Sequence, residues 1–158
     1  MIKKEKKKIT LIGIVIVLIV FIAIQFVPQS LSHENPAVTE EPQWNSLETR
    51  ATFFKACANC HSNETAFPWY STIAPVSWLI ENDVTSGREH FNISEWDRKK
   101  QNGDKAAEEV QRGSMPIGLY LLMHSEANLN AAEKKKFVEG LTATFGTSQH
   151  KRDKIKFE

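Results

Sequence analysis

The sequence predicts an all-helical protein in which one apolar N-terminal helix precedes a single small helical domain. Two observations predict this fold class. The stretch from Ile9 to Val27 contains no charged residue, whereas the rest of the 158-residue chain has the mixed composition of a globular domain. In that second part, apolar residues recur at helical spacing, and no convincing run alternates apolar and polar residues as strands do.

Residues 9–27 are long enough to cross a membrane, because a helix rising about 1.5 Å per residue then just spans a core of roughly 30 Å. The alternative is a cleaved signal peptide, whose shorter apolar region ends in a small-x-small site that "AIQFVPQS" matches poorly. Residues 1–8 carry five lysines and one glutamate, and positive residues stay on the cytoplasmic side. We therefore expect an uncleaved anchor and an exported domain.

Composition divides the exported part into three segments. Residues 28–45 hold three prolines and are typical of a semi-extended linker. The folded domain is expected over residues 46–148, followed by a basic tail over residues 149–158. Removing the five lysines and the glutamate of the N-terminus from the 20 basic and 19 acidic residues leaves 15 against 18. That balance gives no reason to propose nucleic acid as a partner.

Within the domain, the pattern predicts three helices before the last one. Residues 46–61 are expected to be helical, with an apolar face that includes Leu47, Phe53, Phe54 and Ala58. A short helix is expected over residues 77–87, ended by its glycine. A polar helix follows, and Gly113 and Pro116 bring it to a stop.

The last helix has the clearest signals. Asn130 can cap it, with Glu133 at the capping-box position. Its apolar stripe at helical spacing consists of Phe137, Val138, Leu141 and Phe145.

The chain has two cysteines, Cys57 and Cys60, and His61 follows them directly. A disulfide across one turn would close too short a loop to stabilise much, and a thioredoxin-like pair would need a βαβ context. A zinc site would need further ligands. His90 and His124 are the candidates for them, but their spacing from the cysteines does not support such a site. Heme attachment needs only what is present: two thiols for the vinyl groups and an adjacent imidazole for the iron. We therefore predict one covalent heme c.

Four blocks of the sequence carry a resemblance to a known family. They are "CxxCHSNET", "PWYSTIAPVSWLI", "DVTSGREHFNISEW" and "GSMPIGLYLLMHSEANL". In that order they resemble the small heme-binding domain of exported bacterial proteins, a monoheme relative of cytochrome c. The resemblance covers roughly residues 53–141 and implies a c-type heme on an all-helical, cytochrome c-like scaffold. That family tends to have an aromatic residue near Gly140, so the sequence departs from the family there and leaves the tightness of packing of the last helix open.

Several residues are candidates for the heme pocket. Trp69, Tyr70, Trp78 and Arg88 have polar hydrogens that can meet a heme propionate. A ligating imidazole usually donates its second N–H to a carbonyl or carboxylate, and we expect His61 to use the carbonyl of Pro75, with Pro68 as the alternative.

The sixth iron ligand is expected to be Met115, because "RGSMPIG" forces an irregular loop that can present a thioether opposite His61. The resembling family shows the same Met-Pro. The alternatives are His124, which would give bis-histidine ligation, and a Met115 that merely fills the core.

These observations predict a membrane-anchored monoheme cytochrome that carries single electrons and is not an enzyme. Its expected partners are redox proteins of the respiratory chain or periplasm, and its expected place is the bacterial inner membrane with the heme domain in the periplasm. The alternative function is a heme-based sensor of small ligands, or a weak peroxidase, with an open or labile sixth position.

Overall fold

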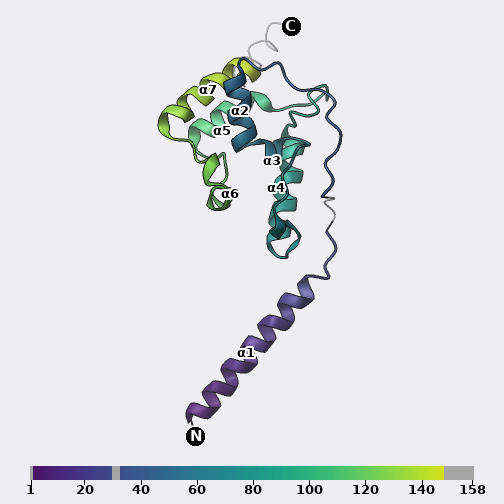
Figure 1. Ribbon diagram of the computed structural model, residues 1–158, viewed down its shortest axis with the longest axis vertical. Helices are drawn as coiled ribbons and strands as arrows, with labels where there is room; N and C mark the ends of the chain where they lie inside the picture. Colours follow the sequence, from purple (N-terminus) through teal and green to yellow (C-terminus); the bar gives the residue numbers. More distant parts are fainter. Residues whose placement is uncertain (1, 30–32, 148–158) are drawn as a thin grey trace, which may run out of the picture. The chain divides into compact units, whose positions relative to one another are not determined.

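The structure is a computed structural model that describes residues 2–29 and 33–147. The chain divides into two compact units, and Figure 1 shows the helices of both. The first unit comprises residues 1–33 and 67–83, and the second comprises residues 34–66 and 84–158. The described residues form helices and no strand, apart from one isolated bridge between Glu40 and Glu95. The predicted all-helical class is confirmed.

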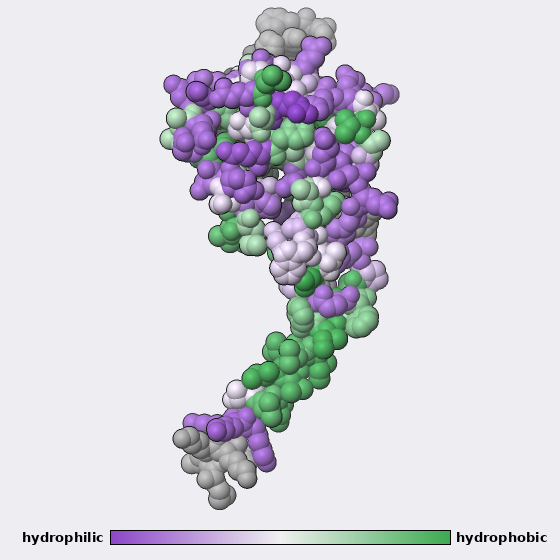
Figure 2. Space-filling view, viewed as in Figure 1, coloured by the Kyte–Doolittle hydropathy of each residue, from purple (hydrophilic) through white to green (hydrophobic). Residues whose placement is uncertain are grey.

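Helix α1 (Ile2–Ile24) dominates the first unit. Its segment Lys6–Ile24 has a mean hydropathy of 2.6, has no buried part, and is the one helix of the described chain long and apolar enough to cross a membrane. Figure 2 shows the apolar surface along this helix and hydrophilic residues near its N-terminal end. A signal sequence would have the same properties. The helix ends three residues before the predicted Val27, because Gln25–Val27 form a turn.

The turn after α1 is tied to the other segment of the first unit. The Gln25 side chain donates from Nε2 to the Ala74 carbonyl and accepts the Ala74 N–H at Oε1, both at 3.0 Å. The segment also contains the short 3-10 helix η1 (Trp69–Thr72) and the first half of α4 (Val76–His90). Both backbone hydrogen-bonding groups of Ala74 are thereby satisfied at the end of α1.

Over its described residues, the second unit holds five α-helices and two 3-10 helices in addition to the C-terminal half of α4. They are α2 (Leu47–Ala56), α3 (Ala58–His61), α5 (Ala106–Arg112), α6 (Gly118–Met123), α7 (Ala131–Phe145) and the 3-10 helices η2 (Gly103–Lys105) and η3 (Ser125–Ala127), the last two short. Gly113 ends α5 in the left-handed conformation, with φ 81°, as expected for a glycine cap.

The buried core of the second unit confirms the stripe expected on α7. Phe53 of α2, Phe91, and Phe137 and Leu141 of α7 are nearly inaccessible to solvent, and Val138 and Phe145 pack against them. Asn130 and Glu133 form the predicted capping box at the start of α7. The expected apolar face of α2 is wrong at one position, because Leu47 lies in the first turn and is 85% exposed.

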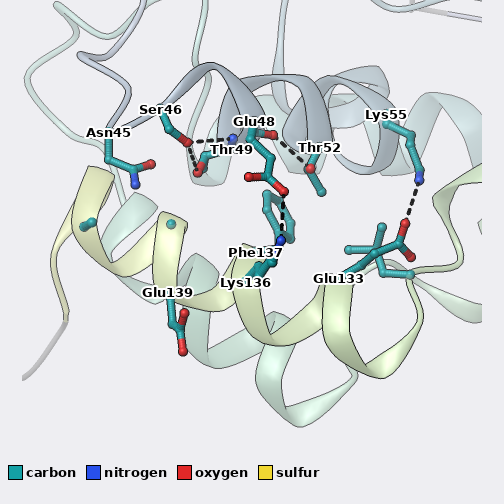
Figure 3. Close-up of a pocket in the computed structure, with 13 residues that line it drawn as sticks. Asn45, Ser46, Glu48, Thr49, Thr52, Lys55, Glu133, Lys136, Phe137 and Glu139 are labelled. Atoms are coloured by element: carbon teal, nitrogen blue, oxygen red, sulfur yellow. Dashed lines mark hydrogen bonds and ion pairs between the residues drawn. The ribbon is translucent and has the colours of Figure 1, made fainter.

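Helices α2 and α7 lie side by side (Figure 3). Gly140 of α7 lies against Thr49 of α2. A Cβ added at Gly140 would come within 2.1 Å of the Thr49 Oγ1 atom. The last helix therefore packs closely at Gly140, since the missing side chain is what lets the two backbones approach. Lys55 and Lys136 form ion pairs with Glu133 and Glu48 across the same seam.

Part of the segment expected to act as a linker contacts the domain. Trp44 packs against Phe53 and Phe145, with ring centroids 5.2 and 5.6 Å away. Glu41 accepts two hydrogen bonds from the guanidinium of Arg50, and the pKa of its carboxyl is lowered, chiefly by that bond. These contacts attach residues 41–44 to the second unit. The basic tail predicted over residues 149–158 lies outside the described residues.

Candidate functional site

The cysteine motif occupies one turn of helix. Cys57 separates α2 from α3, and its carbonyl accepts hydrogen bonds from the N–H groups of Cys60 (3.1 Å) and His61 (3.0 Å). Both cysteines and the histidine are partly buried, and the structure holds the cysteines as thiols. The turn therefore places two thiols three residues apart, with an imidazole directly after them, as the sequence predicts.

The imidazole of His61 has a defined orientation. Its Nδ1 lies 3.2 Å from the carbonyl oxygen of Phe91, and its ring stacks on the Phe91 ring at 4.3 Å between centroids. A carbonyl can only accept, so Nδ1 carries the hydrogen and Nε2 keeps its lone pair. Burial lowers the pKa of His61, which favours the neutral form that binds metals.

The acceptor for His61 differs from our expectation. We expected the carbonyl of Pro75, or that of Pro68, whereas the structure shows the carbonyl of Phe91. The sequence "HFNI" puts Phe91 directly after the last residue of α4, where carbonyl groups lack a partner within the helix. The helix end thus supplies the orienting group that we sought in a proline-rich loop.

Helix α4 reaches Phe91 because it does not stop at Gly87. We expected this glycine to end the helix, but α4 continues to His90. A Cβ added at Gly87 would come within 2.4 Å of the Cys60 carbonyl oxygen. Gly87 is therefore the point where α4 lies against the backbone of the cysteine motif, and it has a packing role in place of a terminating one.

A buried polar network below the motif was not predicted from the sequence. Asn63 donates to the carboxylate of Glu95 and accepts from the amide of Asn92 at 2.7 Å, while its backbone N–H donates to Ser94 Oγ. Asn63, Asn92 and Ser94 are at most 1% exposed. Buried amides of this kind are costly unless bonded, so they fix one register between "HSNE" and "NISEW". The polar residues of this network are visible in the two sequence blocks, but a polar residue type does not by itself indicate that the side chain is buried.

Arg88 belongs to the same region. Its guanidinium donates to the carbonyl of Ser62, to Thr65 Oγ1 and to Asn35 Oδ1 at 2.9 to 3.0 Å. These bonds hold the chain immediately after His61. The predicted contact of Arg88 with a heme propionate stays a prediction.

Helix α6 lies between the two candidates for the sixth iron ligand, Met115 and His124, and it contacts the cysteine motif. The amide of Asn59, inside the motif, donates to the Tyr120 hydroxyl at 2.8 Å, and burial raises the pKa of Tyr120 to about 12. The His124 ring stacks on Tyr120 at 4.1 Å, and its Nδ1 lies 3.0 Å from the Glu126 carboxylate. Met115, in the loop before α6, has a 38% exposed side chain. Neither ligand assignment is tested by this arrangement.

The remaining predicted pocket residues lie in the first unit. Trp69 is exposed, Tyr70 and Trp78 are partly buried, and Pro75 precedes α4. The Nε1 atom of Trp78 is buried and has no hydrogen-bond partner among the described residues. A buried indole N–H normally has one, so this donor fits a polar group of a bound molecule. A role for these four residues in heme binding stays a prediction.

The donor chemistry favours heme over the other two uses of paired cysteines. Burial raises the pKa of Cys57 to about 12, whereas reactive redox cysteines have a lowered pKa. In the part of the chain that the structure describes, no three His, Cys, Asp or Glu side chains gather as a metal site would require. Helix α6 has no buried residue and exposes Leu119, Leu122 and Met123, an apolar surface that a large apolar cofactor suits.

A helical domain with an oriented histidine beside two thiols defines a heme-binding protein, and comparison with known proteins agrees. The family described as Haem-binding domain matches residues 19–143, which is more than half of the chain. The chain belongs to this family. In the same comparisons no curated protein and no solved structure matches it.

Proposed function

We propose that this protein is a membrane-anchored monoheme c-type cytochrome that carries single electrons on the exported side of the membrane. The observation that carries the proposal is the orientation of His61. Its hydrogen bond to the Phe91 carbonyl leaves Nε2 available, one residue after a turn that holds Cys57 and Cys60 together. That combination suits attachment through both thiols and ligation through the neighbouring imidazole.

Each residue of the site has a defined task in this proposal. Cys57 and Cys60 would hold the heme through thioethers, and His61 would bind the iron from one side. Phe91 fixes the tautomer of His61 through its carbonyl, which raises the basicity of the ligating nitrogen. Gly87 lets α4 approach closely enough to present that carbonyl. When bound, the heme would supply an iron that changes oxidation state by one electron.

Met115 is the proposed ligand on the second side of the iron. It comes two residues after Gly113, which ends α5 in the left-handed conformation, so the backbone before Met115 is no longer helical. Thioether ligation raises the reduction potential relative to a second histidine, which suits a carrier that accepts electrons from a respiratory chain. The proposed partners are redox proteins of that chain or of the periplasm.

One observation favours a second candidate, a heme-based sensor or weak peroxidase. The helix that follows Met115, α6, has no buried residue, so apolar packing adds little to the hydrogen bonds that join Ser114 and Met115 to the Glu109 carbonyl. A weakly held loop would release its ligand easily and open a position for carbon monoxide, nitric oxide or peroxide. The two functions share the attachment site and differ in the sixth position.

The deciding experiment uses the full chain, expressed together with a cytochrome c maturation system and isolated in its membrane fraction. The proposal expects red protein whose heme resists extraction by acidic organic solvent, a six-coordinate spectrum in both oxidation states, and slow binding of carbon monoxide. Complete extraction of the heme would contradict covalent attachment. Rapid binding of carbon monoxide by the ferrous wild type would instead support the sensor.

The topology requires a separate measurement. If α1 is an uncleaved anchor with its lysines in the cytoplasm, the protein stays with membranes, and protease added from the periplasmic side digests the heme domain. A mature N-terminus near residue 30 would identify a signal peptide and would leave the heme assignment intact.

A further inference from the structure

The first unit carries an uncharged aromatic segment that is exposed. Residues 67–80, "FPWYSTIAPVSWLI", contain four aromatic residues and no charge. Trp69 is 80% exposed, and Leu79 and Val76 are 53% and 41% exposed. Exposed apolar groups that cluster in one segment mark a surface that contacts a partner.

Hydrogen bonds hold this segment at the C-terminal end of α1. Gln25 is paired with both backbone groups of Ala74, which is 2% exposed. His33 lies 3.1 Å from the Ser71 hydroxyl, and its ring contacts that of Phe67 at 4.7 Å. The turn that contains Gln25 also exposes Phe26 and Val27, so apolar surface continues from the helix to the segment.

The end of a membrane-spanning helix lies at the level of the lipid headgroups, about 30 Å of hydrocarbon from its other end. Tryptophan and tyrosine are enriched at that level, because their rings are apolar and their N–H or O–H groups still reach water. Resting on the proposed anchor, we infer that residues 67–80 dock into the outer surface of the bilayer that α1 crosses, with Trp69, Val76 and Leu79 among the headgroups. In this arrangement the exposed Trp69 faces lipid and does not line the heme pocket, which leaves Tyr70, Pro75 and Trp78 as the pocket candidates of this segment.

The composition of the segment favours a lipid surface without net charge as its binding partner. It has no lysine or arginine with which to bind anionic headgroups, and acidic residues follow it at positions 81 and 83. Contact with lipid beside α1 gives the first unit a second point of attachment, which fixes its rotation about the helix axis. A single spanning helix leaves that rotation unrestricted.

The test places the photo-crosslinking residue p-benzoylphenylalanine at single positions of the full chain in phosphatidylcholine vesicles. Two positions test the segment, one tests the helix end, and one is an exposed apolar control in the second unit; they are Trp69, Leu79, Phe26 and Leu47. All four side chains are exposed, so the substitutions leave the packing of the domain unchanged. After illumination, lipid adducts are measured by mass spectrometry, also in vesicles that contain added phosphatidylglycerol.

We expect adducts at Trp69, Leu79 and Phe26 at several times the yield at Leu47, with no increase when phosphatidylglycerol is added. Adducts at Phe26 without excess yield at Trp69 and Leu79 would overturn the docking and leave the anchor intact. Failure at Phe26 as well would overturn both. Adducts to protein in place of lipid at Trp69, found in native membranes, would also overturn the lipid assignment.

Discussion

A methyl group on Gly87 would come within 2.4 Å of the carbonyl oxygen of Cys60, a distance that no stable structure tolerates. The obstructing atoms belong to backbone, so the contact cannot be relieved by rotating a side chain. Helix α4 would have to move away from the cysteine motif. The same helix ends where Phe91 presents its carbonyl to His61, so the packing at Gly87 and the orientation of the histidine depend on each other.

Gly87→Ala should therefore destabilise the domain by about 1–3 kcal/mol, the usual effect of overpacking a close contact. It should also lower the yield of heme-containing protein. Denaturant unfolding of the full chain in detergent, followed by circular dichroism, measures the first effect. Gly118→Ala is the matched control, because no heavy atom lies within 4 Å of the added carbon there. Equal stability of the two variants would contradict the assigned role of Gly87.

The elements near this contact show what the sequence could predict. Local signals were sufficient for the capping box at Asn130, the glycine cap at Gly113 and the apolar stripe on α7, because each depends on neighbours in the chain. Gly87 was misinterpreted, and the packing at Gly140 was left open, for the opposite reason. The role of each glycine depends on a residue far away in the sequence, Cys60 for Gly87 and Thr49 for Gly140. A glycine in a sequence does not show whether it ends a helix or lets two backbones pack closely.

The residues of the candidate site also fall into those that the sequence could predict and those that it could not. The cysteines and His61 could be proposed from the sequence because their spacing is itself the chemical requirement for heme attachment. The acceptor at Phe91 and the buried Asn63–Asn92 pair were missed, since both join segments about 30 positions apart. A hydrogen bond to a backbone carbonyl has no sequence signature at all, because every residue carries that group.

A second packing prediction concerns the seam between α2 and α7. Gly140→Ala should destabilise the domain, because the added carbon would lie 2.1 Å from Thr49 Oγ1 and 2.9 Å from its Cγ2. Thr49→Ala removes both atoms, so Gly140→Ala should lose much less stability in that background. A double-mutant cycle on unfolding free energies measures the coupling, which should be of the order of 1–3 kcal/mol for residues in contact. Additive effects would mean that the helices do not cross at this point.

A third prediction concerns acid stability and the segment at residues 41–44. The Arg50 side chain lowers the pKa of the Glu41 carboxyl below its ordinary value of 4.5. A depressed pKa in the folded state stabilises the protein above the unfolded pKa, and this contribution is lost as the pH falls below about 4.5. Glu41→Gln should therefore lower the free energy of unfolding at pH 7 and reduce the further loss of stability below about pH 4.5. Glu48→Gln, at an exposed ion pair, should change neither.

A fourth prediction tests attachment of the heme. Cys57→Ala combined with Cys60→Ala should abolish heme staining of the denatured polypeptide, because no thiol then remains to form a thioether. Either single substitution should leave at most one linkage, which shifts the alkaline pyridine hemochrome spectrum of whatever heme is retained. Retention of the wild-type hemochrome in a single variant would show that the replaced cysteine does not bind heme. Immunodetection of equal amounts of protein controls for expression.

The last prediction concerns the sixth ligand, which separates the electron carrier from the sensor. Met115 and His124 lie on either side of α6, and their surroundings differ. His124 already has a partner in Glu126 and stacks on Tyr120, which is itself bonded to Asn59 of the motif. Met115 follows an irregular turn, its side chain is partly exposed, and its thioether makes no hydrogen bond among the residues that the structure describes. The methionine is therefore the group that can be redirected without breaking other bonds.

Met115→Ala should abolish the weak sulfur-to-iron charge-transfer band, lower the reduction potential within the roughly 0.8 V range that axial ligands set, and let carbon monoxide bind ferrous protein rapidly. Met123→Ala is the matched control, because this methionine is exposed at the end of α6, the helix that follows the Met115 loop, and should leave all three properties unchanged. Spectra, redox titration and carbon monoxide kinetics on the full chain measure them. If Met115→Ala changes nothing while His124→Ala alters band and potential, the ligand is His124, and the site is a bis-histidine heme of low potential.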